Sequence, residues 1–87
     1  MQIVFSSHAL ARFSERGITK EEVESAINSG ERVTAKRRMI AYRKNFRFAS
    51  KWKNRYYETK QVMPIVIEKE EKLIVVTVYA FYFGGST

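Results

Sequence analysis

The sequence predicts an α+β domain in which two N-terminal helices pack on a mostly antiparallel sheet of four to five strands. Apolar residues recur with helical spacing up to position 30 and alternate with polar residues from position 31 onward. The chain has 87 residues, of which 45% are hydrophobic. This is the size and composition of one globular domain with a single core, so we assign residues 1–87 to one domain.

The first expected segments are a strand or extended arm at residues 2–5 and a helix that ends near Arg16. Ser6 or Ser7 is the expected N-cap, because a serine hydroxyl accepts a hydrogen bond from a free backbone N–H of the first turn. Gly17 suits the left-handed conformation that often follows a helix. The expected apolar stripe of this helix is Ala9, Leu10 and Phe13.

A second helix is expected from Thr19 to Gly30. Thr19 and Glu22 have the spacing of a capping box, and Ile18 precedes the cap at the position of a hydrophobic staple onto Val23. Its expected buried stripe is Val23, Ala26 and Ile27.

The remaining residues predict a sheet. The expected strands lie near 32–38, 39–44, 46–50, 56–67 and 73–82, and 45–60 leaves room for a long loop. The polar turn EKEEK at 68–72 predicts a hairpin between the last two strands. Pro64 has no N–H to donate, so we expect it at an edge or a bulge. The expected core face of the last strand is Ile74, Val76, Val78, Ala80 and Tyr82, and the terminal GGST is expected to be a flexible tail.

The charge of the chain favours an anionic partner. The net charge is +7, and eleven basic residues lie from Arg32 to Lys60 with Glu58 as the only acidic residue among them. Such residues bind phosphates, and aromatic rings can stack on unpaired bases. The interleaved aromatic residues are Tyr42, Phe46, Phe48, Trp52, Tyr56 and Tyr57. The alternative is that the charges are solvated strand faces and the aromatic rings belong to the core.

Several classes of protein are not expected. The chain has no cysteine and one histidine, which cannot supply the ligands of a zinc site. It has no aspartate, no glycine-rich phosphate loop and no nucleophile elbow. The N-terminus lacks the features of a signal peptide, and no apolar run is long enough to span a membrane. We therefore expect a soluble, cytoplasmic protein that uses no metal or cofactor and has no membrane partner.

The single histidine begins a row of three residues at helical spacing. His8, Arg12 and Arg16 recur every four positions and should lie nearly in line on one helix face. An imidazole exchanges protons near neutral pH, and guanidinium groups bind phosphate, so the row has the groups needed to cleave RNA without metal. The alternatives are that His8 caps or packs the helix, that Arg16 complements the helix C-terminus, and that Arg12 pairs with Glu15 or Glu24.

These residues carry a family resemblance. The stretch FSSHALARFSERGITKEEVESAI resembles the start of small toxin-like domains with the pattern S-x-H-A-x-x-R-x-x-x-R-G-I-x-x-x-x-V. That family is grouped with the barnase/EndoU/colicin/RelE-type ribonuclease fold. The resemblance covers residues 4–30 and continues only in the closing strand IVVTVY. It implies a RelE/barnase-like fold and a metal-independent endoribonuclease, often the toxin of a toxin–antitoxin pair. The partners it implies are RNA and an acidic antitoxin protein.

The resemblance also implies site residues. His8 corresponds to the helix histidine, Arg12 and Arg16 to its basic companions, and Thr77 and Tyr79 to the closing strand. The cation that the sheet should place opposite His8 is assigned to Arg43 or Arg47.

The first hypothesis is cleavage by attack of the 2′-hydroxyl, which leaves a 2′,3′-cyclic phosphate. His8 acts as general base or acid, Arg12 and Arg43 clamp the phosphate, and Tyr79 orients the substrate or transfers a proton. The RNA-binding residues are expected to be Arg16, Arg37, Arg38, Lys44, Arg47, Trp52 and Thr77. Two alternatives remain: a non-catalytic nucleic-acid-binding module on the same fold, and an assembly subunit whose aromatic strand edge pairs with a partner chain.

Overall fold

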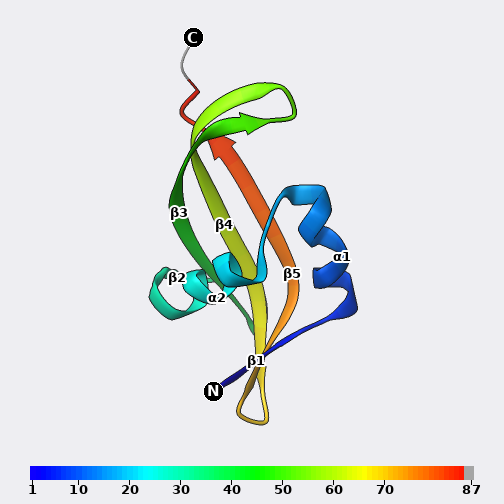
Figure 1. The fold of residues 1–87 in the computed structure, drawn as a ribbon. Coiled ribbons are helices and arrows are strands. Elements are labelled where there is room, and N and C mark those ends of the chain that lie inside the picture. The colour runs from blue at the N-terminus through cyan, green and yellow to red at the C-terminus, as the bar shows by residue number, and fades with distance from the viewer. Residues whose placement is uncertain (86–87) are drawn as a thin grey trace.

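The computed structural model describes residues 1–85 and contains two helices and one five-stranded sheet (Figure 1). The elements are β1 (Gln2–Phe5), α1 (Ser7–Arg16), α2 (Lys20–Ser29), β2 (Glu31–Thr34), β3 (Met39–Trp52), β4 (Arg55–Lys69) and β5 (Lys72–Phe83). The strand order is β1-β5-β4-β3-β2. Only β1 and β5 pair in parallel. The predicted α+β class, with two N-terminal helices on a mostly antiparallel sheet, is confirmed.

The expected helix caps are present. Ser6 Oγ accepts a hydrogen bond of 3.0 Å from the first turn of α1. Gly17 ends α1 with φ 67°. Its place also requires glycine, because a Cβ there would lie 2.6 Å from Tyr82 Oη. Thr19 and Glu22 form the capping box of α2. Leu10 is 50% exposed, so it does not belong to the buried stripe of α1.

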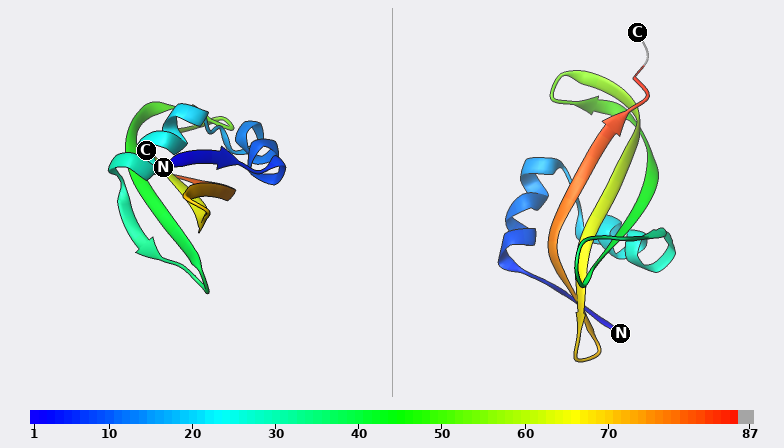
Figure 2. Two further views of the ribbon diagram at one scale, coloured as in Figure 1. Left: turned by 90° about the horizontal axis from the view of Figure 1, so that it is seen from below. Right: turned by 180° about the vertical axis from the view of Figure 1, so that it is seen from behind.

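Both helices lie on the same face of the sheet, with α1 against β5 and α2 against β3 and β4. Figure 2 shows them together behind the sheet when the molecule is seen from the back. The core lies between these layers and consists of Ala9, Ile18, Val23, Ile27, Val62, Val66, Leu73, Val75 and Val78. Within residues 1–85, no helix covers the opposite face of the sheet.

The third and fourth strands are longer than predicted. β3 continues unbroken to Trp52, so the expected break after residue 44 and the long loop within 45–60 are wrong. Lys53 and Asn54, with φ 51° and 70°, connect β3 to β4 in a two-residue turn. A β-bulge near Ala49 (φ 45°) adds a residue to β3. The bulge interrupts the alternation of side chains near Ala49, inside the region 45–60 where a loop was expected.

Two chain segments differ in a smaller way from the prediction. β2 ends at Thr34 instead of near 38, because Met39 N donates to Lys36 O at 3.1 Å and turns the chain. The expected tail begins with an ordered contact, since Glu58 N donates to Gly84 O at 3.0 Å. The last two residues of that expected tail, 86–87, lie outside the described residues.

Pro64 lies in the central strand β4, so of its two expected positions the edge is wrong, whereas a bulge does lie next to it. Its missing N–H is accommodated by a local gap in the ladder, because the β3–β4 register skips Tyr42 and Arg43. The register of β4 with β5 shifts nearby, between Ile65 and Val66. A central strand therefore holds a proline where the neighbouring ladder needs no donor.

The fifth strand changes face at a bulge. The register with β4 shifts at Val76, which is the extra residue on β5. Leu73 and Val75 face the core before the bulge, and residues 78, 80 and 82 face it afterwards. The prediction of the core face is confirmed for Val78, Ala80 and Tyr82, which follow the bulge. It is wrong for Ile74 and Val76, which precede or form the bulge.

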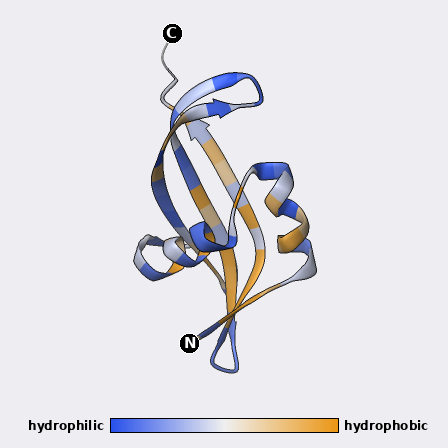
Figure 3. Ribbon diagram, viewed as in Figure 1, coloured by the Kyte–Doolittle hydropathy of each residue, from blue (hydrophilic) through white to orange (hydrophobic). Residues whose placement is uncertain are grey.

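The face away from the helices is not covered by any helix within residues 1–85, and its middle is apolar and aromatic. Cross-strand pairs place mostly apolar and aromatic residues there, and they add basic residues from β3, such as Arg43 and Arg47, and the pair Lys69 and Lys72 at the β4–β5 hairpin. Hydrophilic residues gather instead at the tips of the two long hairpins (Figure 3). The apolar and aromatic residues of this face are Met63, Ile65, Ile67, Ile74, Tyr79, Phe81 and Phe83.

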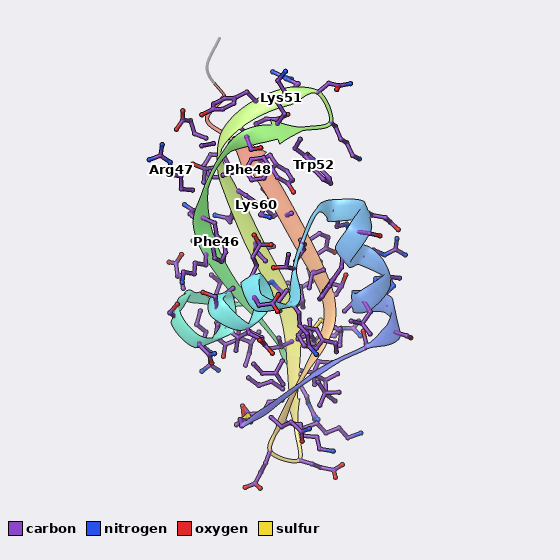
Figure 4. The ribbon with its side chains drawn as sticks, viewed as in Figure 1. Phe46, Arg47, Phe48, Lys51, Trp52 and Lys60 are labelled. Carbon is purple, nitrogen blue, oxygen red and sulfur yellow. The ribbon has the colours of Figure 1, made fainter. Side chains whose placement is uncertain are left out.

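A buried lysine joins the helix corner to the sheet. Lys60 on β4 is only 6% exposed, and its Nζ lies 2.8 Å from Gly17 O and 2.6 Å from Glu22 Oε2. Phe48 lies against the same ammonium group, and Figure 4 shows Phe48, Lys60 and Trp52 on the helix side of the sheet. Tyr82 Oη donates to Arg16 O at 2.7 Å. These contacts fix the α1–α2 corner on β4 and β5.

We predict that the Lys60–Glu22 pair is strongly coupled. Lys60→Met leaves the Glu22 carboxylate without its partner and should reduce the free energy of unfolding by about 2 kcal/mol. Glu22→Gln keeps an acceptor for the capping box and serves as the second single variant. A double-mutant cycle in urea should give a coupling energy of about 1–2 kcal/mol. Strictly additive effects would contradict this prediction.

We also predict a loss of stability in alkali that depends on Tyr82. Burial, and then the negative charge of Glu22, raises the pKa of Tyr82 to about 12. The folded state therefore favours the protonated phenol, and this contribution is complete below the unfolded pKa of about 10. It should be lost as the pH rises through about 12. Urea unfolding at increasing pH should show that the free energy of unfolding falls more steeply in alkali for the wild type than for Tyr82→Phe. Equal slopes for the two proteins would disprove this role of Tyr82.

Candidate functional site

Helix α1 lies alongside the outer edge of β5. At its start, Ser6 N donates to Val75 O at 3.0 Å and Ser6 Oγ donates to Val76 O at 3.1 Å. At its end, Arg16 Nη1 donates to Val78 O at 2.5 Å. The helix and the strand therefore run in the same direction. The row of His8, Arg12 and Arg16 on this helix, called the α1 stripe or helix stripe below, runs in the direction of β5 and contacts it through Arg16.

Arg16 connects this stripe to the open face of the sheet. Its Cζ lies 5.0 Å from the ring centroid of Tyr79, close enough for a cation–π interaction. Tyr79 is 39% exposed, and Thr77 lies two residues earlier on β5. Among the predicted site residues, the structure therefore brings Arg16 of α1 into contact with Tyr79 of β5, while His8 and Arg12 lie on the same helix and Thr77 on the same strand.

His8 is exposed in the first turn of α1. Ser6, not His8, is the N-cap, and no hydrogen bond or ion pair to His8 occurs among residues 1–85. Its imidazole is therefore available to a ligand, and the capping and packing alternatives lose their support. Arg12 forms the predicted pair with Glu15, with Nη1 and Oε2 2.6 Å apart. Because this pair is solvent-exposed, it is weak, and an incoming phosphate can compete for Arg12.

Arg43 lies away from this group. It is on β3, two strands from β5, which places it about 10 Å across the sheet at ordinary strand spacing. Its Nε lies 2.6 Å from Glu31 Oε1. The hydrogen bond and charge of Arg43 lower the pKa of Glu31, and Glu31 raises the pKa of Arg43 in turn. Arg47 is exposed on the same strand, beside a shallow hollow, and extends outward in Figure 4. Neither sheet cation faces His8.

The other predicted RNA-binding residues are dispersed. Arg37 and Arg38 are exposed in the turn between β2 and β3. Lys44 Nζ donates to Ser25 Oγ at 2.7 Å and to Ser29 Oγ at 2.8 Å, so it holds α2 on the sheet. Trp52 stacks on Tyr82, with ring centroids 5.0 Å apart. Lys44 and Trp52 therefore already have intramolecular partners.

Lys60, Glu22 and Tyr82 form a cluster that was not predicted from the sequence, although Glu22 was expected in the capping box and Tyr82 in the core. The available signal was the alternation in β4, because Lys60 shares its parity with the apolar Val62 and Val66. A lysine on a buried face needs an anionic or carbonyl partner. This cluster holds the backbone of Arg16 and so positions the end of the stripe.

If α1 binds and cleaves RNA, as the resemblance implies, we predict that Arg43→Ala leaves both activities at the wild-type level, because Arg43 lies on the far side of β4 from α1. Arg12→Ala should weaken both, since Arg12 belongs to the exposed stripe. Fluorescence anisotropy with a labelled RNA and a cleavage assay compare the two variants at equal net charge. A greater loss for Arg43→Ala than for Arg12→Ala would show that the site lies on β3.

Comparisons with known proteins give one match. Residues 5–80 match the model of a domain family of unknown function, DUF4258. No curated protein and no solved structure matches the chain. Among the described residues, no helix is long and apolar enough to cross a membrane.

Proposed function

This chain belongs to DUF4258, a domain family of unknown function, and we propose that it is a metal-independent endoribonuclease that acts as the toxin of a toxin–antitoxin pair. The resemblance of residues 4–30 to toxin-like ribonuclease domains supports the proposal. The arrangement of two helices before an antiparallel sheet is compatible with the RelE/barnase-like fold that the resemblance implies.

The observation that carries the proposal is the position of the helix stripe. His8 is exposed and has no hydrogen-bonded partner among residues 1–85. Arg12 and Arg16 follow it along the β5 edge, and Arg16 contacts Tyr79. The helix that carries His8 and the two arginines thus meets the strand that carries Tyr79 through Arg16. These side chains can bind a phosphodiester and transfer protons around it.

The proposed reaction needs only these groups. His8 takes the proton of the 2′-hydroxyl, and the resulting oxygen bonds to phosphorus while the bond to the 5′-oxygen breaks. The leaving oxygen takes a proton from Tyr79 or from water. Arg12 and Arg16 stabilise the negative charge that develops on the phosphoryl oxygens. Arg16 replaces Arg43 as the second cation, because Arg43 lies on β3, which β4 separates from β5 and the helix stripe.

We predict that His8→Ala lowers cleavage by a factor of about 100 or more, the usual contribution of a general base. The measurement is cleavage of a 5′-labelled structured RNA in EDTA, with the product ends mapped. The wild type should give 2′,3′-cyclic phosphate ends. Ser14→Ala, an exposed change on the same helix, is the matched control and should cleave normally. Undiminished cleavage by His8→Ala would remove His8 from the mechanism.

A second function, a nucleic-acid-binding module without catalysis, is favoured by one observation. Arg37 and Arg38 in the β2–β3 turn and Lys53 at the β3–β4 hairpin tip are exposed, so basic residues that can contact phosphates extend well beyond the helix that carries His8. Under this alternative, wild type and His8→Ala bind RNA equally and neither cleaves it. Binding should then weaken steeply as salt is raised.

A further inference from the structure

The outer edge of β5 is only partly covered. β1 pairs with β5 from Lys72 to Val75 and then leaves the sheet. Farther along the strand, the Ser6 hydroxyl donates a hydrogen bond to Val76 O, and the Arg16 guanidinium group donates one to Val78 O. Beyond Val78, no strand or side chain among residues 1–85 bonds to this edge. β5 nevertheless continues to Phe83.

The backbone of this free segment points outward. Val78 directs its carbonyl away from β4, as its bond to Arg16 shows. Backbone groups of an antiparallel strand alternate between its two sides, so Ala80 and Tyr82 direct their N–H and C=O groups outward as well. Those four groups form a template for one more strand.

The other free edge of the sheet differs in composition. β3 extends beyond β2 with exposed Arg47 and Lys51, and a bulge at Ala49 distorts the strand. Charges and bulges are the usual means of preventing strand pairing. The free part of β5 has neither, and its sequence from Tyr79 to Phe83 is YAFYF. Of the two edges, only that of β5 is suited to pair.

The surroundings of the β5 edge indicate what would pair with it. Phe81 and Phe83 are 45% and 43% exposed beside it. Arg16 lies at one end, and Lys53 lies over Trp52, which stacks on Tyr82 near the other end. An incoming strand would thus meet apolar side chains along its length and a cation at each end.

We propose that the β5 edge from Ala80 to Tyr82 binds an extended acidic segment of a partner protein by strand addition. Acidic residues at the ends of the segment pair with Arg16 and Lys53, and its apolar residues cover Phe81 and Phe83. The net charge of +7 favours such a partner over a second copy of this chain. The inference rests on backbone geometry and does not depend on RNA cleavage.

The test uses a synthetic heptapeptide of alternating glutamate and valine with blocked termini, added to the full chain without RNA. Nuclear magnetic resonance should show saturable binding, with the amides of Ala80 and Tyr82 newly protected from hydrogen exchange. The same peptide with alternate amides methylated cannot form strand hydrogen bonds and should not bind. Equal binding of the methylated peptide would overturn the proposal. This comparison needs no variant of the protein, so misfolding cannot explain its result.

Two variants locate the site. Ala80→Pro removes one outward N–H and no bond to β4, so it should fold and lose at least about tenfold in affinity. Lys53→Asn should weaken binding about threefold. Lys36→Asn is its matched control, since it removes the same charge from the distant β2–β3 turn, and it should have no effect. Equal losses in the two lysine variants would indicate non-specific charge attraction.

Two further outcomes would also overturn the proposal. Protection of Asn45 and Arg47 in place of Ala80 and Tyr82 would move the docking strand to β3. Sedimentation of the free chain as a dimer that Ala80→Pro dissociates would assign the edge to a second copy of the chain. Because no step involves RNA, failure of the ribonuclease proposal would leave this result unchanged.

Discussion

The buried ion pair between Lys60 and Glu22 is the contact on which the rest of the structure depends. Lys60 lies under the α1–α2 corner and bonds to both Glu22 and the carbonyl of Gly17. A buried ammonium group is costly unless its donors are satisfied, so the corner can occupy only the position that supplies these partners. That position places Arg16 against β5, where its guanidinium group reaches Val78 and Tyr79. The geometry of the candidate site thus follows from an interaction outside it.

Two bulges determine which side chains reach the surface. The bulge at Val76 turns Leu73 and Val75 toward the core, and it leaves Tyr79 on the open face. The bulge near Ala49 lets β3 bend so that Trp52 stacks on Tyr82. Long strands can twist and fold over a small helical layer only if their ladders are interrupted at such points. The open aromatic face and its free edge are consequences of these interruptions.

The basic residues from Arg32 to Lys60 do not form one binding surface. Lys60 and Lys44 hold the helices on the sheet, and Arg43 is paired with Glu31. A cation already bonded within the protein contributes less to phosphate binding than its charge suggests, because the existing bond must first be broken. Exposed basic residues that form no ion pair within residues 1–85 lie instead in the β2–β3 turn and at the β3–β4 hairpin tip. The net charge of the chain therefore does not locate a binding surface on it.

The sequence alone determined the features that depend on neighbours within about four residues. The serine and threonine caps, the left-handed Gly17 and the hairpin turn at 70–71 were all predictable, since each is satisfied inside one turn or loop. The alternation of apolar residues determined the α+β class. Only the tertiary structure decided which partner each charged residue meets, as with Lys60 and Gly17, which are 43 positions apart. It also decided the faces beyond the bulges, because a one-residue insertion inverts a period of two and has no local sequence signature here.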